Sequence, residues 1–368
     1  MSRRSPMPDP LPYTPEIEVI GPDEEAVQAG MIAAFARIQG TTLEDYGRAV
    51  RGVHAKCHGL LTGTLEVLPG LPPDLAQGAF ARPGTHEAVL RLSTNPGDIL
   101  DDSVSTPRGL ALKILEVPGE RLPGAEGTTQ DFVLADAPAF VAPDAAAFLG
   151  SLKLLAATTD TPQIFKKAFS ATLRGVETVL ETFGTGSPTV IALGGHPETH
   201  ILGETFYSQA PLRWGDHVAK VAVAPASPAL RALAGASLSV TGRPDGLREA
   251  VSAFFEENEA VWELRAQLWT NRETMPIEDA SVPWPEEESP YRTVARITVP
   301  PQETWSPEKV RAIEDGLAFS PWHGIAAHRP LGSIMRARRA VYPHSARFRA
   351  EHNGCPIREP DSLARMGL

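Results

Sequence analysis

The chain has 368 residues, of which 42% are hydrophobic and 21% are charged, and its formal net charge at pH 7 is -11. This composition is typical of a folded globular protein, and the acidic charge argues against nucleic acid as a partner, because nonspecific binding needs a basic surface. No apolar run approaches the roughly 20 residues that cross a bilayer, the N-terminus has no apolar signal segment, and two cysteines form no disulfide framework. We therefore expect no membrane span and a cytoplasmic location.

The first part of the chain predicts a helix followed by strands. Residues 1–16 are rich in proline and polar residues, and we expect them to form a loose N-terminal arm, with a single domain at 17–368. Apolar residues recur every three or four positions at 23–38, up to Gly40, which predicts a helix. Short alternating runs between Gly- and Pro-rich turns predict antiparallel strands at 61–67, 87–93, 109–117 and 130–136.

The second part of the chain alternates between helices and strands. A helical block is expected at 144–183 and a final helix at 333–349. A short helix is predicted at 306–316, with Ser306 at the N-cap and Gly316 at the C-cap. Strands are predicted between them, at 200–208, 217–224, 237–242, 262–269 and 291–299. The fold class that follows is α+β, with two groups of strands around a helical insertion.

The segment from Arg51 to Gly59 concentrates reactive side chains. His54 and His58 are four residues apart, which is the spacing of two metal ligands on one helix face. The glycines of this segment argue against a long helix, and no carboxylate completes a metal set. Three roles stay open at this point: a metal site, one functional histidine in an extended segment, or a hydrogen-bonded structural histidine.

A polar segment at 91–109 carries three carboxylates, Asp98, Asp101 and Asp102. Paired carboxylates can act as acid and base or bind a hard cation. In a turn this polar, aspartates commonly form local hydrogen bonds to the backbone. We therefore expect a solvated loop, with a catalytic or cation-binding role as the alternative.

The predicted helix at 333–349 carries arginines around one tyrosine, Tyr342. Arg338 and Tyr342 are i and i+4, so they share a helix face. A guanidinium beside a phenol favours the phenolate and lowers its pKa, and tyrosine is one of the few axial ligands of haem iron. By itself the pattern is also consistent with a solvent-exposed basic face.

Four motifs, in this order, resemble those of the haem catalases, in particular the small catalase-related haem enzymes of bacteria. They are Arg-Gly-Val-His-Ala-Lys at 51–56, Arg-Leu-Ser-Thr at 91–94, Pro-Arg-Gly-Leu-Ala-Leu-Lys at 107–113 and Arg-x-x-x-Tyr at 338–342. The resemblance covers most of the chain. It implies a catalase-like antiparallel β-barrel with helices packed around it, and haem b buried between the barrel and the C-terminal helix.

The resemblance also implies roles for individual residues. His54 would be the distal acid and base, oriented by Ser93, and Tyr342 would be the iron ligand, kept ionised by Arg338. A neutral histidine suits a group that first takes and then returns a proton, and an anionic ligand pushes electron density onto iron. The other expected haem contacts are Arg51, Arg91 and, outside the motifs, Arg349 at the propionates, and Val53, Phe140 and Phe148 near the ring.

The sequence departs from the resemblance at one position. Catalases place an asparagine beside the distal histidine, and an ungapped alignment puts Ala135 there, followed by Asp136. Alanine cannot donate a hydrogen bond to peroxide, and Asp136, the remaining catalytic candidate, donates only when protonated. By analogy with an oxyanion hole, losing a positioned donor costs about 2 to 4 kcal/mol of transition-state stabilisation. We therefore expect peroxidase activity, on hydrogen peroxide or organic hydroperoxides, to exceed catalase activity.

The remaining expectations concern the end of the chain and its partners. The sequence ends soon after Tyr342, at Leu368, so we expect neither the wrapping segment nor the extra domain of longer catalases. The expected partners are a small-molecule peroxide and a reducing co-substrate, in a role against oxidative stress, and formation of a homo-oligomer stays open. Two alternative functions are a hydroperoxide-rearranging haem enzyme of the same fold and a non-catalytic haem-binding protein. Cys57 is expected to be a packed thiol.

Overall fold

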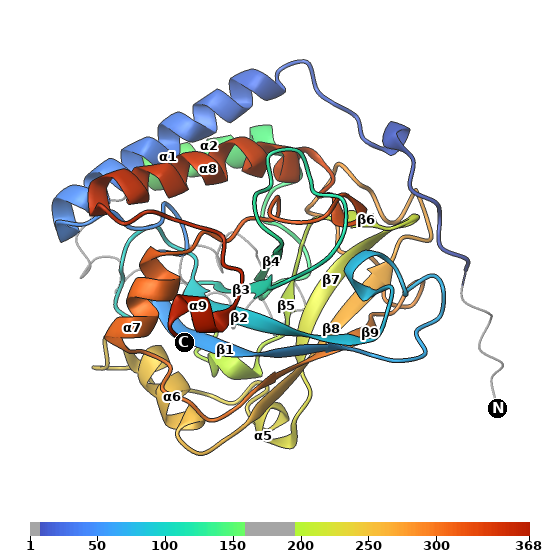
Figure 1. The fold of residues 1–368 in the computed structure, drawn as a ribbon. Coiled ribbons are helices and arrows are strands. Elements are labelled where there is room, and N and C mark those ends of the chain that lie inside the picture. Colours follow the sequence, from blue (N-terminus) through green and yellow to red (C-terminus); the bar gives the residue numbers. More distant parts are fainter. Residues whose placement is uncertain (1–7, 159–195) are drawn as a thin grey trace, which may run out of the picture.

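A closed ring of eight antiparallel β-strands forms the centre of the structure, a computed structural model that describes residues 8–158 and 196–368. The strands pair in the order β5, β4, β3, β2, β1, β9, β8 and β7, and β5 also pairs with β7, which closes the ring. The short strand β6 pairs with β7 next to this closure. The ring confirms the predicted antiparallel barrel and the α+β class (Figure 1).

Longer strands form most of the barrel wall, and the two shortest strands, β5 and β6, lie at the closure. Their bounds are β1 (Cys57–Val67), β2 (Gly84–Thr94), β3 (Arg108–Ile114), β4 (Gln130–Ala135), β5 (Phe206–Tyr207), β6 (Leu212–Trp214), β7 (His217–Pro225), β8 (Ala260–Leu268) and β9 (Arg292–Val299).

Side chains on successive strand residues point to opposite faces of the barrel wall. Leu90 and Leu92 of β2 belong to the large interior core, together with aromatic residues such as Trp262 of β8. Val89 of β2 belongs instead to an outer cluster with Ile313 and neighbouring residues. The same alternation gives β2 an outward row that also holds Arg91 and Ser93, and this row becomes important for the site.

Three long helices cover one side of the barrel: α1 (Glu24–Tyr46), α2 (Ala145–Thr158) and α8 (Ser333–Asn353) (Figure 1). They share an apolar cluster that includes Phe35 of α1, Leu152 of α2 and Val341 of α8. The shorter helices are α5 (Pro228–Arg231), α6 (Gly246–Phe255), α7 (Pro307–Lys309) and α9 (Leu363–Met366). The predicted arrangement of helices around a barrel is therefore confirmed.

Helix α1 is longer than predicted. It continues through Gly40 to Tyr46 and ends at Gly47, whose φ is 65° and whose N–H donates to the Leu43 carbonyl at 2.9 Å. A glycine inside a helix costs only about 1 kcal/mol, so Gly40 does not end the helix. A glycine in the left-handed conformation, as at Gly47, does.

The predicted strands at 200–208 and 237–242 are only partly present. The first begins as a 3-10 helix, Ile201–Gly203, capped by the His200 ring, which accepts the Leu202 N–H. The second contains a single bridge, from Ser237 to Thr199. Its alternating pattern reflects the burial of Val240 in the barrel core and the packing of Leu238 against that core, which does not require a neighbouring strand.

The predicted helix at 306–316 is present but changes its type. The Ser306 hydroxyl accepts the Lys309 N–H at 3.2 Å and caps α7 as predicted. After α7 the chain forms a π-helix, Val310–Asp315, which Gly316 follows. The predicted helical block at 144–183 begins as α2, and its part from 159 on lies outside the described residues.

The described part of the predicted N-terminal arm lies against the barrel. The Leu11 N–H donates to the Trp269 carbonyl at 2.8 Å, and the Tyr13 N–H donates to the Asp216 carbonyl at 2.8 Å. A short 3-10 helix, Pro15–Ile17, follows. Among the described helices, none has the length and the apolar character needed to cross a membrane.

Candidate functional site

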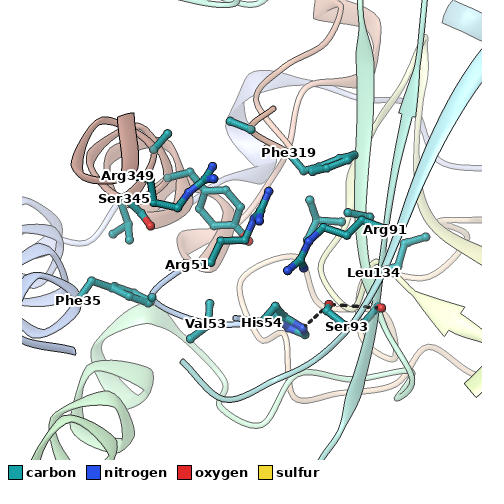
Figure 2. Close-up of a pocket in the computed structure, with 18 of the residues that line it drawn as sticks. Phe35, Arg51, Val53, His54, Arg91, Ser93, Leu134, Phe319, Ser345 and Arg349 are labelled. Carbon is teal, nitrogen blue, oxygen red and sulfur yellow. Dashed lines mark hydrogen bonds between the residues drawn. The ribbon is translucent and has the colours of Figure 1, made fainter. Parts of the chain in front are cut away.

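A cavity lies between the outer wall of the barrel and helix α8, with about 720 Å³ of empty space that is partly open to solvent. Strands β2, β3 and β4 supply one wall, and α1, the segment before β1 and α8 supply the others. Seven of the predicted site residues line it: Arg51, Val53, His54, Arg91, Ser93, Tyr342 and Arg349 (Figure 2).

His54 is fixed by its backbone and by its ring. It has a φ of 52°, a left-handed conformation that histidine adopts more readily than most residues, and its N–H donates to the Asn95 carbonyl at 2.7 Å. Nδ1 lies 3.1 Å from Ser93 Oγ, which in turn lies 3.5 Å from the Gly109 carbonyl oxygen (Figure 2). Since the serine hydroxyl donates to that carbonyl, its oxygen accepts from Nδ1–H, and Nε2 is left as a free base.

The His54 ring occupies space that a side chain at position 109 would fill. A Cβ on Gly109 would lie 2.5 Å from the His54 Cε1 and 2.6 Å from its Nδ1. Burial, and next the charge of Arg91, lower the pKa of His54 to about 3. The imidazole is therefore neutral at pH 7, as a proton acceptor must be.

Strand alternation explains why the barrel side of the cavity is both polar and open. Arg91 and Ser93 are two residues apart on β2, so both face outward. Their partners on β3 are Ala111 and Gly109, two of the smallest residues, and both line the cavity.

On the side of the cavity opposite the barrel, helix periodicity places several residues of α8 on one face. Tyr342, Ser345, Ala346 and Arg349 all line the cavity, and their spacing of i, i+3, i+4 and i+7 places them on one face of α8. No hydrogen bond of the Tyr342 phenol is found within the described part of the chain. The phenol oxygen is thus available to a ligand in the cavity.

Three predicted residues lie beside the cavity rather than in its wall: Arg338, Phe140 and Phe148. The Arg338 guanidinium lies 5.6 Å from the Phe140 ring centroid, and its Nη1 lies 3.6 Å from the Met335 sulfur. The Phe140 and Phe148 rings are 4.9 Å apart and nearly perpendicular. The predicted contact between Arg338 and Tyr342 is not among those formed by the described side chains.

The guanidinium groups of Arg51, Arg91 and Arg349 gather on one side of the cavity, near Phe319 (Figure 2). All three contact Glu314, which the sequence analysis did not select as a site residue. Burial alone would raise the pKa of Glu314, but Arg51 and Arg91 outweigh it and lower the pKa to about 2. The sequence gives no signal for this role, because a glutamate on a short helix is usually exposed.

Two aromatic residues of the cavity, Phe35 and Phe319, were also not selected from the sequence. Phe35 belongs to the helix cluster of α1, and Phe319 belongs to the outer cluster of the barrel. Nothing in their sequence context separates them from other core phenylalanines, since only the packing of distant elements places them around the same space.

The two residues at the expected asparagine position point in different directions. Ala135 pairs with Gly109 and shares its strand face with Val133, which lines the cavity. Asp136 does not line the cavity: its Oδ2 accepts the Arg108 N–H at 2.9 Å and lies 2.9 Å from His196 Nε2. Strand alternation therefore places Asp136 outside the lining of the cavity, and its catalytic role stays a prediction.

His54 and His58 have separate environments. His58 is fully buried on β1, and its Nε2 lies 3.1 Å from the Thr94 hydroxyl. It does not line the cavity. Of the roles left open by the sequence, the hydrogen-bonded structural histidine describes His58.

The expected solvated loop around the three aspartates is wrong for two of them. Asp101 and Asp102 are buried, and Asp102 Oδ1 lies 2.8 Å from the buried Lys56 ammonium. Asp102 Oδ2 accepts the Leu247 N–H at 2.8 Å. Burial follows because this segment packs against α6, and the carboxylate then needs a paired cation.

Cys57 is a buried thiol in the outer cluster, as expected. Burial raises the pKa of this thiol to about 12. It is therefore neutral and unreactive at pH 7.

Comparison with known proteins gives matches at the level of structure. No protein-family model and no curated protein matches the sequence. A fungal catalase superposes with a TM-score of 0.59 at 18% identity, over 85% of this chain and 61% of that one. Catalase A from Saccharomyces cerevisiae superposes with a TM-score of 0.57 at 18% identity, over 84% and 63%. A bacterial catalase superposes with a TM-score of 0.54 at 16% identity, over 96% of this chain and 67% of that one.

The comparison shows how much of those proteins this chain corresponds to. The chain spans about three fifths of the length of the fungal catalase and of catalase A from yeast. At this level of identity the similarity concerns the arrangement of the strands and helices. The closed barrel, the helices α1, α2 and α8 on its side and the superposition on three catalases together show that this chain has a catalase-like fold.

Proposed function

We propose that the chain is a haem-dependent hydroperoxidase that reduces hydrogen peroxide or organic hydroperoxides. One observation carries the proposal: His54, with its Nδ1 bound by Ser93, and Tyr342 line the same cavity from different elements. The catalase-like fold supports a peroxide-handling enzyme with a haem cofactor. The cytoplasmic location and the role against oxidative stress expected from the sequence belong to this proposal.

The residues of the cavity fit haem b in three respects. The phenol of Tyr342 is an oxygen donor that can ligate ferric iron. The apolar side chains of Phe35, Val53 and Val341 suit the flat ring of a porphyrin. The Arg349 Nε atom is buried and has no hydrogen-bond partner among residues 8–158 and 196–368. Such a group needs an acceptor, which a ligand carboxylate would supply.

Bound haem would supply the redox chemistry, and the protein would supply a proton acceptor, an anionic ligand and positioned cations. His54 Nε2 takes a proton from one oxygen of the hydroperoxide and returns it to the other. Ser93 keeps Nδ1 protonated during this transfer. Arg338, one turn before Tyr342, is proposed to favour the phenolate through its charge.

The distal side supports peroxidase rather than catalase as the main activity. Ala135 faces the cavity side of β4 and offers no hydrogen-bond donor, while Asp136 is bound to Arg108 and His196. Loss of one positioned donor costs about 2 to 4 kcal/mol of transition-state stabilisation in comparable sites. A reducing co-substrate would then complete the cycle faster than a second molecule of hydrogen peroxide.

The Tyr342→Phe variant tests the proposed iron ligand. We expect it to lose most of its haem or to show a changed ferric absorption spectrum, since phenylalanine has no donor atom. Tyr13→Phe, which alters a tyrosine of the N-terminal segment itself, is the control and should keep both the haem content and the spectrum. A Tyr342→Phe protein with full haem content and an unchanged spectrum would contradict the assignment.

The His54→Ala variant tests the proton acceptor. We expect it to bind haem and to react with peroxide roughly 10² to 10⁴ times more slowly, as measured by rapid mixing. The control is His352→Ala, which changes an exposed histidine on α8 and should react at the normal rate. If His54→Ala left the rate unaltered, His54 would not be the proton acceptor.

Product analysis with a fatty-acid hydroperoxide, with and without a phenolic reductant, separates reduction of the hydroperoxide from its rearrangement.

A further inference from the structure

Three guanidinium groups from distant parts of the chain are held by one short segment, residues 314–317. Arg91 binds the Glu314 carboxylate with both Nε, at 2.6 Å, and Nη2, at 3.0 Å. Arg51 forms an ion pair with the same carboxylate and donates to the Leu317 carbonyl at 3.3 Å. Arg349 donates to the backbone carbonyls of Glu314 and Leu317, both at 3.0 Å. Within this segment, one carboxylate and two carbonyls bind all three cations, and Arg91 also donates to the Ala55 carbonyl at 3.3 Å.

The local backbone places Glu314 in this position. It lies in the π-helix Val310–Asp315, an uncommon structure that often occurs at functional sites. The neighbouring Ile313 is fully buried in the outer cluster of the barrel. Glu308, on α7 just before the π-helix, is exposed and pairs with the exposed Arg311. The two glutamates of this helical segment thus have opposite environments.

The charges of the three arginines and Glu314 do not balance without a ligand. Arginine is always protonated in proteins, so Arg51, Arg91 and Arg349 carry three positive charges. Glu314 supplies one negative charge, since its pKa is about 2. The nearby Arg48 and Asp315 pair with each other and do not change the sum. Two positive charges are left in a buried region, which is costly unless anionic groups pair with them.

We propose that Glu314 is a positioning residue that adjusts the cationic side of the cavity to a ligand with two carboxylates. It holds Arg51 and Arg91 in place and reduces three positive charges to two. The cavity then favours a dicarboxylate porphyrin over one with fewer or more carboxylates. This inference rests on the proposed function for the identity of the ligand as a porphyrin.

Metal-free porphyrins test the proposal without activity and without the iron ligand. The full chain, freed of porphyrin, is titrated with protoporphyrin IX, its monomethyl ester, its dimethyl ester and the tetracarboxylate coproporphyrin, and binding is followed by porphyrin fluorescence. We expect the wild type to bind the diacid at least about tenfold more tightly than the other three, because an unpaired buried charge costs more than 1.4 kcal/mol, which is a factor of ten.

The Glu314→Gln variant changes the charge at nearly constant shape. We expect the affinity ratio of coproporphyrin to protoporphyrin IX to rise about tenfold, because three positive charges then remain. Glu308→Gln is the matched control in the same helical segment, and its ratio should stay that of the wild type. Comparing ratios removes the effect of ligand size, which is the same in both proteins.

The Arg51→Gln variant tests the same charge count by removing a positive charge instead of a negative one. It leaves one positive charge, so the advantage of protoporphyrin IX over its monomethyl ester should fall about tenfold. If Glu314→Gln does not fold, the porphyrin ratios of Arg51→Gln test the proposal by themselves. A merely structural role would weaken all four porphyrins by the same factor and leave the ratios unchanged, and that result would overturn the proposal.

The two proposals fail in different ways. A protein that shows the expected porphyrin ratios but neither binds haem iron through Tyr342 nor reacts with peroxide contradicts the proposed function only. A protein that takes up haem and reduces peroxide, but whose porphyrin ratios do not respond to Glu314→Gln or Arg51→Gln, contradicts only the role of Glu314.

Discussion

At the scale of single residues, the site depends on a histidine that is fixed before any ligand arrives. The left-handed backbone of His54, its N–H bond to Asn95 and its Nδ1 contact with Ser93 each restrict the ring. The absence of a side chain at Gly109 provides the space that the ring occupies. A positioned acid-base group is worth more than a mobile one, because even a 1 Å displacement can cost about 100-fold in rate.

The Gly109→Ala variant tests this dependence. Its added methyl group would overlap the His54 ring, so we expect the ring to move and the reaction with peroxide to slow by roughly 100-fold. The overpacking should also lower the free energy of unfolding by about 1 to 3 kcal/mol. The control is Gly84→Ala, on β2, where a Cβ would meet no atom within 4 Å. A Gly109→Ala protein that reacts at the normal rate would show that the ring position is not critical.

At the scale of elements, the segment that follows α8 is attached to the outer wall of the barrel by a buried ionic cluster. Lys113 of β3 is fully buried, and its ammonium lies 2.9 Å from Asp131 Oδ1 of β4 and 2.6 Å from Glu359 Oε2. Glu359 also accepts from the Thr129 hydroxyl at 2.6 Å. The Lys113 ammonium lies 5.6 Å from the ring of Phe319, so the cluster supports one wall of the cavity.

The Glu359→Gln variant tests the attachment of this segment. It leaves Lys113 buried with one carboxylate instead of two, and we expect the free energy of unfolding to fall by about 3 kcal/mol. Chemical denaturation measures the loss. Asp361→Asn, which removes an exposed pair with Arg365 in the same segment, should have little effect. Equal stability of the two variants would mean that the cluster does not hold the C-terminal segment.

At the scale of the whole molecule, one histidine links the stability of the fold to pH. His323 Nδ1 lies 3.0 Å from Glu359 Oε1 and 3.3 Å from Asp131 Oδ2, so it connects the C-terminal segment to the barrel. Burial alone would lower the pKa of His323, but its ion-pair contacts with Asp131 and Glu359 outweigh burial and raise the pKa to about 9. The folded protein therefore holds this proton more tightly than the unfolded chain, in which the pKa is about 6.5.

The sign of the pH dependence follows from this difference. The contribution of His323 to stability is complete below about pH 6.5 and is lost as the pH rises through about 9. We expect the free energy of unfolding to fall by about 2 to 3 kcal/mol over this interval. In His323→Gln this part of the decline should disappear, whereas His352→Gln, on the exposed side of α8, should keep it. An identical decline in all three proteins would exclude His323 as its cause.

Features that depend on local pattern could be predicted from the amino-acid sequence. Strand alternation and turn residues predicted most strands of the barrel. Helical spacing predicted α1, and the capping residues Ser306 and Gly316 predicted the helical segment that begins with α7. The motif residues His54, Ser93 and Tyr342 were selected from the sequence, and all three line one cavity. These predictions succeed because each depends on a few neighbouring residues or on a motif of fixed spacing.

The surroundings of each side chain follow from long-range packing and could not be predicted from local pattern. The folded chain brings Arg51 and Arg91 to Glu314 across more than 200 residues of sequence, and Arg349 across 35. No local pattern indicates that this glutamate is buried. The direction of Asp136, away from the cavity, follows from the register of β4 with β3. Burial, charge pairing and pKa depend on long-range packing, so the sequence names the reactive groups and the fold determines which of them can act together.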